Sequence, residues 1–332
     1  MNEDFDLEAL LASGPDLFAD PTRRPDTDFD KAMRAYETAL PRGYLSNSQI
    51  GTFLKCGKVY EYRYVMGIKT RSNSAMAQGS AVHAAADVLH KSMKDGAPIP
   101  LEAVKDAYAD AHEKYFDPNN EVELDEDDTD LGAVKDRGMG LVTLYRKAAL
   151  GQHVPLPAKG EPAKPALRPL LVINSERAIR TTIVARDAAG EPMHEPVPLV
   201  AIIDVEEPHM TRDLKVRKKL PSASEADNSL QLNLYAEVRR NEIVESGGVL
   251  PPDVPGLFDV SIDALIKPSA KLPERYIRFE TQTTANSRAH AVAIATEVAD
   301  DIREGRFRRT SPDAWWCSEG WCGYWHLCRG KK

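Results

Sequence analysis

The stretch VPLVAIIDVEEPHMTRDLK, residues 197–215, decides the fold. It opens with an apolar, β-branched run that ends at Asp204 and closes with a second short run that carries Asp213 and Lys215. The residues EPHM between the runs are a turn signal, so the sequence predicts two adjacent strands with the two aspartates side by side. Asp213 and Lys215 are two positions apart on one strand, so both side chains point to one face, about 6.6 Å apart along the chain.

Two converging carboxylates beside a lysine favour a site for a hard divalent cation. Carboxylate oxygens suit Mg²⁺ and Mn²⁺, and a lysine next to the metal can act on a water or stabilise charge on a phosphate. The alternative is a surface hairpin with solvated charges, because Asp-x-Lys is common by chance. Asp204 weighs against that alternative, since a carboxylate at the end of a buried strand needs a partner or a metal.

Outside this hairpin the sequence predicts helices, then the rest of a sheet, then more helices. Ser46 followed by Gln49 has the capping-box pattern of a helix start. Helices are expected near 30–40 and over about 75–94, 101–116, 131–150, 222–243 and 284–303, and further strands over 170–187, 257–267 and 275–282, with a Pro-rich connector over 154–169. The fold class is therefore α/β, with a central mixed β-sheet flanked by helices.

The expected domain organisation is an acidic, loosely held segment over 1–43 and a single domain over 44–332. Within that domain, 44–155 is mainly helical, 168–282 forms the sheet core, and 283–332 forms a helix and a cysteine tail.

The net charge of −8 is unevenly distributed. Residues 1–40 carry −6 and residues 117–130 carry −8, so the remaining chain carries +6. We expect both acidic blocks to be solvated, and a basic remainder is compatible with nucleic acid. No apolar run approaches the ~20 residues of a membrane span, and the N-terminus lacks the pattern of a signal peptide. The expected location is the cytoplasm, or the host cytoplasm if the protein is phage-encoded.

Two helix patterns add candidate site residues. QGSAVH places Gly79 and His83 one turn apart, which makes His83 a candidate third metal ligand. QLNLY places Gln231 and Tyr235 on one helix face, where both could hydrogen-bond a phosphate or a flipped base. Taken alone, each pattern is more often an ordinary packed or exposed pair.

In this order the motifs resemble those of the RecB-type family within the PD-(D/E)xK nuclease superfamily, over about 44–330. The resemblance implies a restriction-endonuclease-like core. It implies that metal is bound by His83, Asp204, Asp213 and the backbone carbonyl of Leu214. It also implies that Lys215 is the catalytic lysine and that Gln231 and Tyr235 contact DNA or support the active site. Glu176, on the preceding strand, is a candidate acid behind the ligands. One departure is Ala201, where the family usually has a glycine three residues before the first aspartate.

The four cysteines add a second site. Cys56 lies near the head of the chain and Cys317, Cys322 and Cys328 lie in its tail, which is unlike a secreted disulfide framework. An iron–sulfur subset of the family, which includes AddB-type and CRISPR-associated exonucleases, has one cysteine before the core and three after it. The resemblance therefore implies a [4Fe–4S] clasp between the N-terminal helical segment and the C-terminal tail. The tail spacing is C-x4-C-x5-C instead of the usual C-x2-C-x5-C, and four thiolates could instead hold Zn²⁺.

The expected function is that of a metal-dependent DNA exonuclease, using Mg²⁺ or Mn²⁺ at single-stranded ends, in phage or bacterial recombination or repair. One alternative is a non-catalytic DNA-binding adaptor with a structural Fe–S or Zn site, and another is a zinc-ribbon-like interaction protein. The intact set of Asp204, Asp213 and Lys215 favours the enzyme. Strand polarity, endonuclease action, the oligomeric state and a recombinase or helicase partner are left open.

Overall fold

The computed structural model describes residues 27–126, 128–152, 167–208, 210–222, 224–247 and 258–330. The chain divides into two compact units. Unit 1 consists of Met1–Arg71, Ala178–Ala201 and Ala285–Lys332, and unit 2 consists of Ser72–Arg177 and Ile202–Thr284. The expected boundary at residue 43 stays a prediction.

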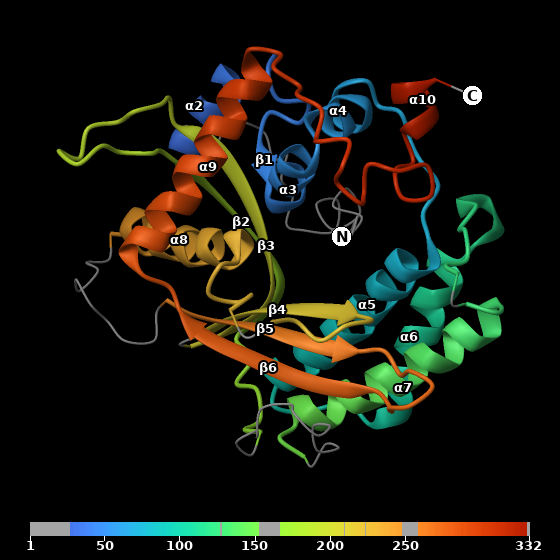
Figure 1. The fold of residues 1–332 in the computed structure, drawn as a ribbon. Coiled ribbons are helices and arrows are strands. Elements are labelled where there is room, and N and C mark those ends of the chain that lie inside the picture. The colour runs from blue at the N-terminus through green and yellow to red at the C-terminus, as the bar shows by residue number, and fades with distance from the viewer. Residues whose placement is uncertain are drawn as a thin grey trace. The chain divides into compact units, whose positions relative to one another are not determined.

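A mixed β-sheet supplies the frame (Figure 1). Its six strands are β1 (Leu45–Ser46), β2 (Asn174–Ile183), β3 (Val197–Glu207), β4 (Met210–Arg217), β5 (Asp259–Ile266) and β6 (Arg275–Gln282). The order is β1-β3-β4-β5-β6, with β2 also paired to β3. β1 is parallel to β3 and β4 is parallel to β5, whereas β3–β4 and β5–β6 are antiparallel. The predicted mixed sheet is confirmed.

In unit 2, three helices pack on one face of the sheet and a fourth follows β4. They are α5 (Ser74–Lys94), α6 (Leu101–Tyr115), α7 (Leu131–Ala149) and α8 (Leu230–Glu245), with a short 3₁₀ turn, η3 (Pro118–Asn120). Figure 1 shows α5, α6 and α7 gathered together, with β4, β5 and β6 side by side. The buried core joins these helices to Leu214 of β4, Leu265 of β5 and Tyr276 of β6. Since side chains alternate along a strand, Asp213 and Lys215 belong to the opposite face of β4.

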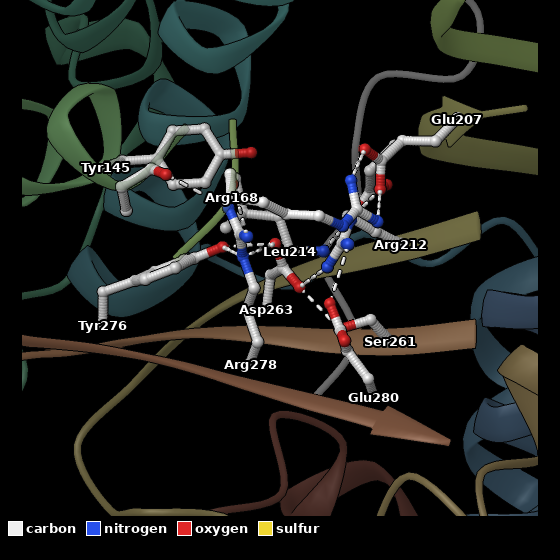
Figure 2. Close-up of polar contacts among 12 residues, drawn as sticks. Tyr145, Arg168, Glu207, Arg212, Leu214, Ser261, Asp263, Tyr276, Arg278 and Glu280 are labelled. Atoms are coloured by element: carbon white, nitrogen blue, oxygen red, sulfur yellow. Dashed lines mark hydrogen bonds and ion pairs between the residues drawn. The ribbon is translucent and has the colours of Figure 1, made fainter. Parts of the chain in front are cut away.

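A buried ion network ties β4, β5 and β6 together on the helix-covered face (Figure 2). Arg212 of β4 is fully buried and donates hydrogen bonds to Glu207, Asp263 and Glu280 at 2.6, 3.0 and 2.9 Å. Each guanidinium nitrogen thus has a carboxylate partner, which offsets the cost of burying the charge. The network holds in register the strand that carries the site residues.

In unit 1, the head and the tail of the chain pack together. The helices are α2 (Asp28–Ala35), α3 (Asn47–Lys55), α4 (Gly57–Tyr60), the π-helical turn η2 (Glu61–Val65), α9 (Ala285–Arg303) and α10 (Trp325–Arg329). Ser46 caps α3 as its sequence pattern predicted, by accepting a hydrogen bond from the Gln49 N–H. Rings of Phe53 and Tyr60 from the head contact Phe307 from the tail.

Two expectations from the sequence are wrong in part. The helix expected over 222–243 begins at Leu230, because the Ser229 side chain caps it there and the residues just before form turns. The acidic block 117–130 is not wholly solvated. The side chain of Asp128 is only 2% exposed, pairs with Arg137 at 2.7 Å and accepts a hydrogen bond from Ser74.

Two segments expected from the sequence lie mostly outside the part of the chain that the structure describes. Most of the acidic segment 1–43 and most of the connector 154–169 lie outside the described residues. Among the helices that the structure does describe, none has the length and apolar character of a membrane span.

Candidate active site

The β3–β4 hairpin brings the two predicted aspartates together. Val205 pairs with Arg212 across the hairpin, so the next pair in this register is Asp204 with Asp213. The Leu214 N–H donates a 2.7 Å hydrogen bond to Asp204 Oδ2. Asp204 is 9% exposed and Asp213 is 2% exposed. Two carboxylates so removed from water need protons or cations to neutralise them.

Three side chains from three different elements converge on one point. His83 comes from α5, Glu176 from β2 and Asp204 from β3. His83 Nδ1 lies 3.4 Å from Glu176 Oε1 and 3.8 Å from Asp204 Oδ2. One ligand atom of each residue lies within 4.8 Å of the others, and all three residues are buried. One imidazole nitrogen and two carboxylates are a fitting donor set for Mn²⁺ or Mg²⁺.

Glu176 reaches this point through an unusual backbone conformation. Its φ is +47°, in the left-handed region, although it lies within a strand and is not glycine. Such a conformation costs about 1–3 kcal/mol and persists where the surroundings enforce it, often at functional sites. The sequence pattern assigned Glu176 only a supporting role, whereas the structure places its carboxylate beside His83.

Asp213 and Lys215 form the adjoining part of the site. Asp213 is not one of the three converging residues. Its Oδ1 lies 3.0 Å from Lys215 Nζ. The lysine Nζ also donates to Gln231 Oε1 at 3.3 Å, which directs the ammonium group toward the carboxylates. Metal binding by Asp213 and by the Leu214 carbonyl stays a prediction.

Gln231 and Tyr235 act as a support on α8. Gln231 Nε2 donates to the Tyr235 hydroxyl at 2.7 Å, and that hydroxyl donates to the Ile202 carbonyl on β3. Tyr235 is 2% exposed, so its contacts are with the protein interior. Gln231 is only half-buried, and both roles expected for this pair stay predictions.

Burial and neighbouring carboxylates make the ionised form of Asp204 unfavourable unless a positive charge is nearby. Burial raises the pKa of Asp204 well above its ordinary value; His83 opposes this rise, and Glu176 and Asp213 add to it. A divalent cation would reverse the balance, because it favours the ionised carboxylate. Metal binding at this cluster would therefore be coupled to loss of a proton from it.

The cysteine tail contacts the segment that contains Cys56, all within unit 1. Trp316 Nε1 donates to the Lys55 carbonyl at 3.3 Å, and Tyr324 donates to the Ile68 carbonyl at 2.8 Å. These contacts already join the head to the tail without any inorganic group.

The four cysteines are not close together in this structure. Burial raises the pKa of Cys322, and the other three cysteines also influence it electrostatically. Among the described residues, however, no three cysteine sulfurs lie within 4.8 Å of one another. A tetrahedral zinc site with Zn–S bonds of about 2.3 Å needs sulfurs about 3.8 Å apart. Every trio of these sulfurs thus has at least one distance longer than that. The predicted iron–sulfur clasp stays a prediction.

A sheet-bound pair of acids, a lysine beside them and a histidine near the first acid are an arrangement that can hold a divalent cation. Over residues 44–329 the chain matches the family model described as the PD-(D/E)XK nuclease superfamily. The chain belongs to this superfamily. Membership implies a metal-dependent nuclease that uses Mg²⁺ or Mn²⁺, and the six-stranded mixed sheet agrees with a restriction-endonuclease-like fold.

The other comparisons add little. No curated protein matches the chain. The crystal structure of SSO0001 is similar over 48% of this chain and 61% of that chain, with 13% sequence identity and a TM-score of 0.29. The match therefore spans less than two thirds of that protein's length.

Two residues near the site were missed in the sequence. His90 lies seven residues after His83 on α5, and Ser175 directly precedes Glu176. The seven-residue spacing, which places both histidines on one helix face, was the available signal for His90. Nothing local distinguishes Ser175, because its importance depends on contacts with distant segments.

Proposed function

We propose that the protein is a DNA exonuclease that hydrolyses phosphodiester bonds at single-stranded ends, in recombination or repair. The observation that carries the proposal is the convergence of His83, Glu176 and Asp204 beside the Asp213–Lys215 pair. A non-catalytic scaffold would not require a buried acidic cluster with a lysine directed at it.

The residues divide the work of hydrolysis among them. His83, Glu176 and Asp204 would hold the divalent cation, with Asp213 completing the set from the neighbouring strand. When bound, the cation lowers the pKa of a coordinated water and polarises the phosphate. Lys215 is oriented by Asp213 and Gln231, so its ammonium can stabilise charge on the phosphate or exchange a proton with the water.

A preference for single strands is supported by the surface of unit 1. Trp315 and Trp321 are 59% and 55% exposed, and their rings lie 5.0 Å apart. Arg308 and Arg309 are exposed on the same tail. Exposed aromatic rings with nearby arginines suit the stacking of unpaired bases along a backbone of phosphates.

The test is cleavage of end-labelled linear and circular single-stranded DNA, with and without Mg²⁺ or Mn²⁺. We expect linear strands to be shortened from an end and circles to survive. Cutting of circles at the same rate would replace exonuclease with endonuclease action. A folded, metal-loaded protein that cuts neither substrate would support the adaptor alternative instead.

We also propose that Cys56, Cys317, Cys322 and Cys328 hold a [4Fe–4S] cluster. Arg309 donates to Cys328 Sγ at 3.4 Å and Arg329 donates to Cys317 Sγ at 3.7 Å, and such cations favour an anionic group at this position. Anaerobically purified protein should be brown, with a broad visible absorbance that dithionite bleaches. Zinc without iron or sulfide in metal analysis would establish the zinc alternative.

A further inference from the structure

A continuous series of buried and partly buried hydrogen bonds runs behind the proposed metal site in unit 2. His90 Nε2 lies 2.7 Å from the Tyr145 hydroxyl, and His90 Nδ1 lies 3.1 Å from Ser175 Oγ. Ser175 Oγ in turn donates to the Asp204 carbonyl at 3.3 Å. This series of hydrogen bonds therefore ends on the backbone of Asp204, one proposed metal ligand. It passes through Ser175, the residue next to Glu176, another proposed ligand.

If all three hydrogen bonds form, the donor of each one follows from the carbonyl at the end of the series. A carbonyl only accepts, so the single hydroxyl proton of Ser175 is used on Asp204. Ser175 Oγ must then accept from His90 Nδ1–H, and Nε2 of the neutral ring accepts from the Tyr145 hydroxyl. Burial lowers the pKa of His90 to about 4, which agrees with a neutral ring of one tautomer at physiological pH.

The residues on either side of Glu176 are held as firmly. Asn174 Nδ2 donates to Glu206 Oε2 at 2.7 Å. Arg177 donates to both carboxylate oxygens of Glu206, at 2.8 and 2.6 Å, and also pairs with Glu242. Glu176 alone in this segment points to the cluster, with its φ at +47°. These anchors supply the constraint that a strained residue needs in order to persist.

We propose that His90 and Ser175 are positioning residues that hold Glu176 and Asp204 in the geometry required to bind the metal. The inference rests on the proposed metal-dependent function of the cluster. Neither residue is one of the three side chains that converge on the proposed metal position. Groups that orient metal ligands typically change metal affinity or activity about 10–100-fold when they are removed.

The test measures Mn²⁺ affinity of the full chain without DNA, by titration calorimetry or by electron paramagnetic resonance of free Mn²⁺. Ser175→Ala should bind Mn²⁺ about tenfold or more weakly, whereas Ser175→Thr, which keeps the hydroxyl, should remain within about threefold of the parent. His90→Gln should resemble Ser175→Ala. The double variant should be no weaker than either single variant, because all three break the same series of hydrogen bonds.

A matched control separates positioning from stability. Ser261 donates a 2.7 Å hydrogen bond to Asp263 in the buried network of the same unit (Figure 2). Ser261→Ala should lower the melting temperature but leave Mn²⁺ affinity unchanged. A Ser175→Ala protein that is folded and binds Mn²⁺ as tightly as the parent would overturn the inference.

Asp204→Asn distinguishes this failure from failure of the proposed function. If Asp204→Asn loses Mn²⁺ and Ser175→Ala does not, only the positioning role is wrong. If Asp204→Asn binds Mn²⁺ like the parent, the cluster is not the metal site, and the positioning role is overturned with it.

Discussion

At the scale of single residues, Glu176 shows how the site opposes stability. Its backbone is strained, and its buried carboxylate lies in the same cluster as that of Asp204, on which Asp213 also acts electrostatically. Like charges this close disfavour one another unless a cation intervenes. In the metal-free protein this arrangement costs stability, and binding of a cation would offset the cost. Such a conflict between stability and function is common at functional sites.

Glu176→Gln should separate the effect of this carboxylate on stability from its effect on metal binding. Removing one buried negative charge relieves repulsion, so the metal-free variant should melt at the parent temperature or above it. Its Mn²⁺ affinity should fall about 10–100-fold, because a ligand has been lost. Thermal melts with and without Mn²⁺ measure both quantities. A variant that melts lower and binds metal normally would show that Glu176 is a structural acid.

The raised pKa of Asp204 leads to a pH prediction. The metal-free carboxyl keeps its proton at pH values where an ordinary aspartate is ionised, and binding of a cation must release that proton. Mn²⁺ affinity should therefore weaken as pH falls from about 8 to about 5. Calorimetry in buffers of different ionisation enthalpy should detect proton release in the parent and less in Asp204→Asn. Equal proton release by both proteins would show that the released proton comes from a group other than Asp204.

The residues that sequence could identify are those with a local signal. An apolar run ending in Asp204, the Asp213-x-Lys215 strand and the helical Gly79–His83 pair are each visible within a few positions. The role of Glu176 depends on a positive φ and on anchors to Glu206 and Glu242, and no periodicity encodes such contacts. His90 was hidden in an Ala-rich helix, where a buried histidine looks like ordinary core.

At the scale of elements, strands and long helices followed their hydrophobic patterns closely. The main error was the start of α8, which begins at Leu230 although helix-favouring residues extend the pattern back to 222. Capping by Ser229 decides the boundary, and a cap is hard to choose when several serines precede a helix. The close approach of the tail to the α3–α4 junction joins segments some 250 residues apart in sequence. Only the resemblance that grouped Cys56 with the tail cysteines suggested it, because no local pattern encodes such a contact.

Gly57 provides the test of that approach. A Cβ at this position would lie 2.8 Å from both the backbone nitrogen and the carbonyl oxygen of Arg308. Gly57→Ala must therefore displace the tail, and we expect a loss of about 1–3 kcal/mol in stability. Gly320→Ala is the control, because a Cβ there meets nothing within 4 Å. Equal melting temperatures for the two variants would argue against tight packing at the junction.

At the scale of the whole molecule, charge is divided between acidic blocks and a basic remainder. Residues 1–26 carry seven acids and two bases, so their removal changes the net charge from −8 to −3. These residues lie outside the described part of the chain and contribute none of the proposed site residues.

Deleting residues 1–26 should leave metal-dependent cleavage largely intact. DNA binding should strengthen at low salt, because negative charge that repels phosphates has been removed, and the difference should shrink as salt rises. Fluorescence anisotropy across a salt series measures this effect. Loss of cleavage by a truncated protein that still melts like the parent would assign the segment a direct role.

The most direct test of the central claim compares metal binding and cleavage in Lys215→Ala and Asp204→Asn. Lys215→Ala removes no ligand, so Mn²⁺ should bind at least as tightly as in the parent, while single-turnover cleavage of single-stranded DNA should fall about 10²–10⁴-fold. Asp204→Asn should lose both metal affinity and cleavage. If Lys215→Ala cuts DNA at the parent rate, the hydrolysis does not take place at these residues.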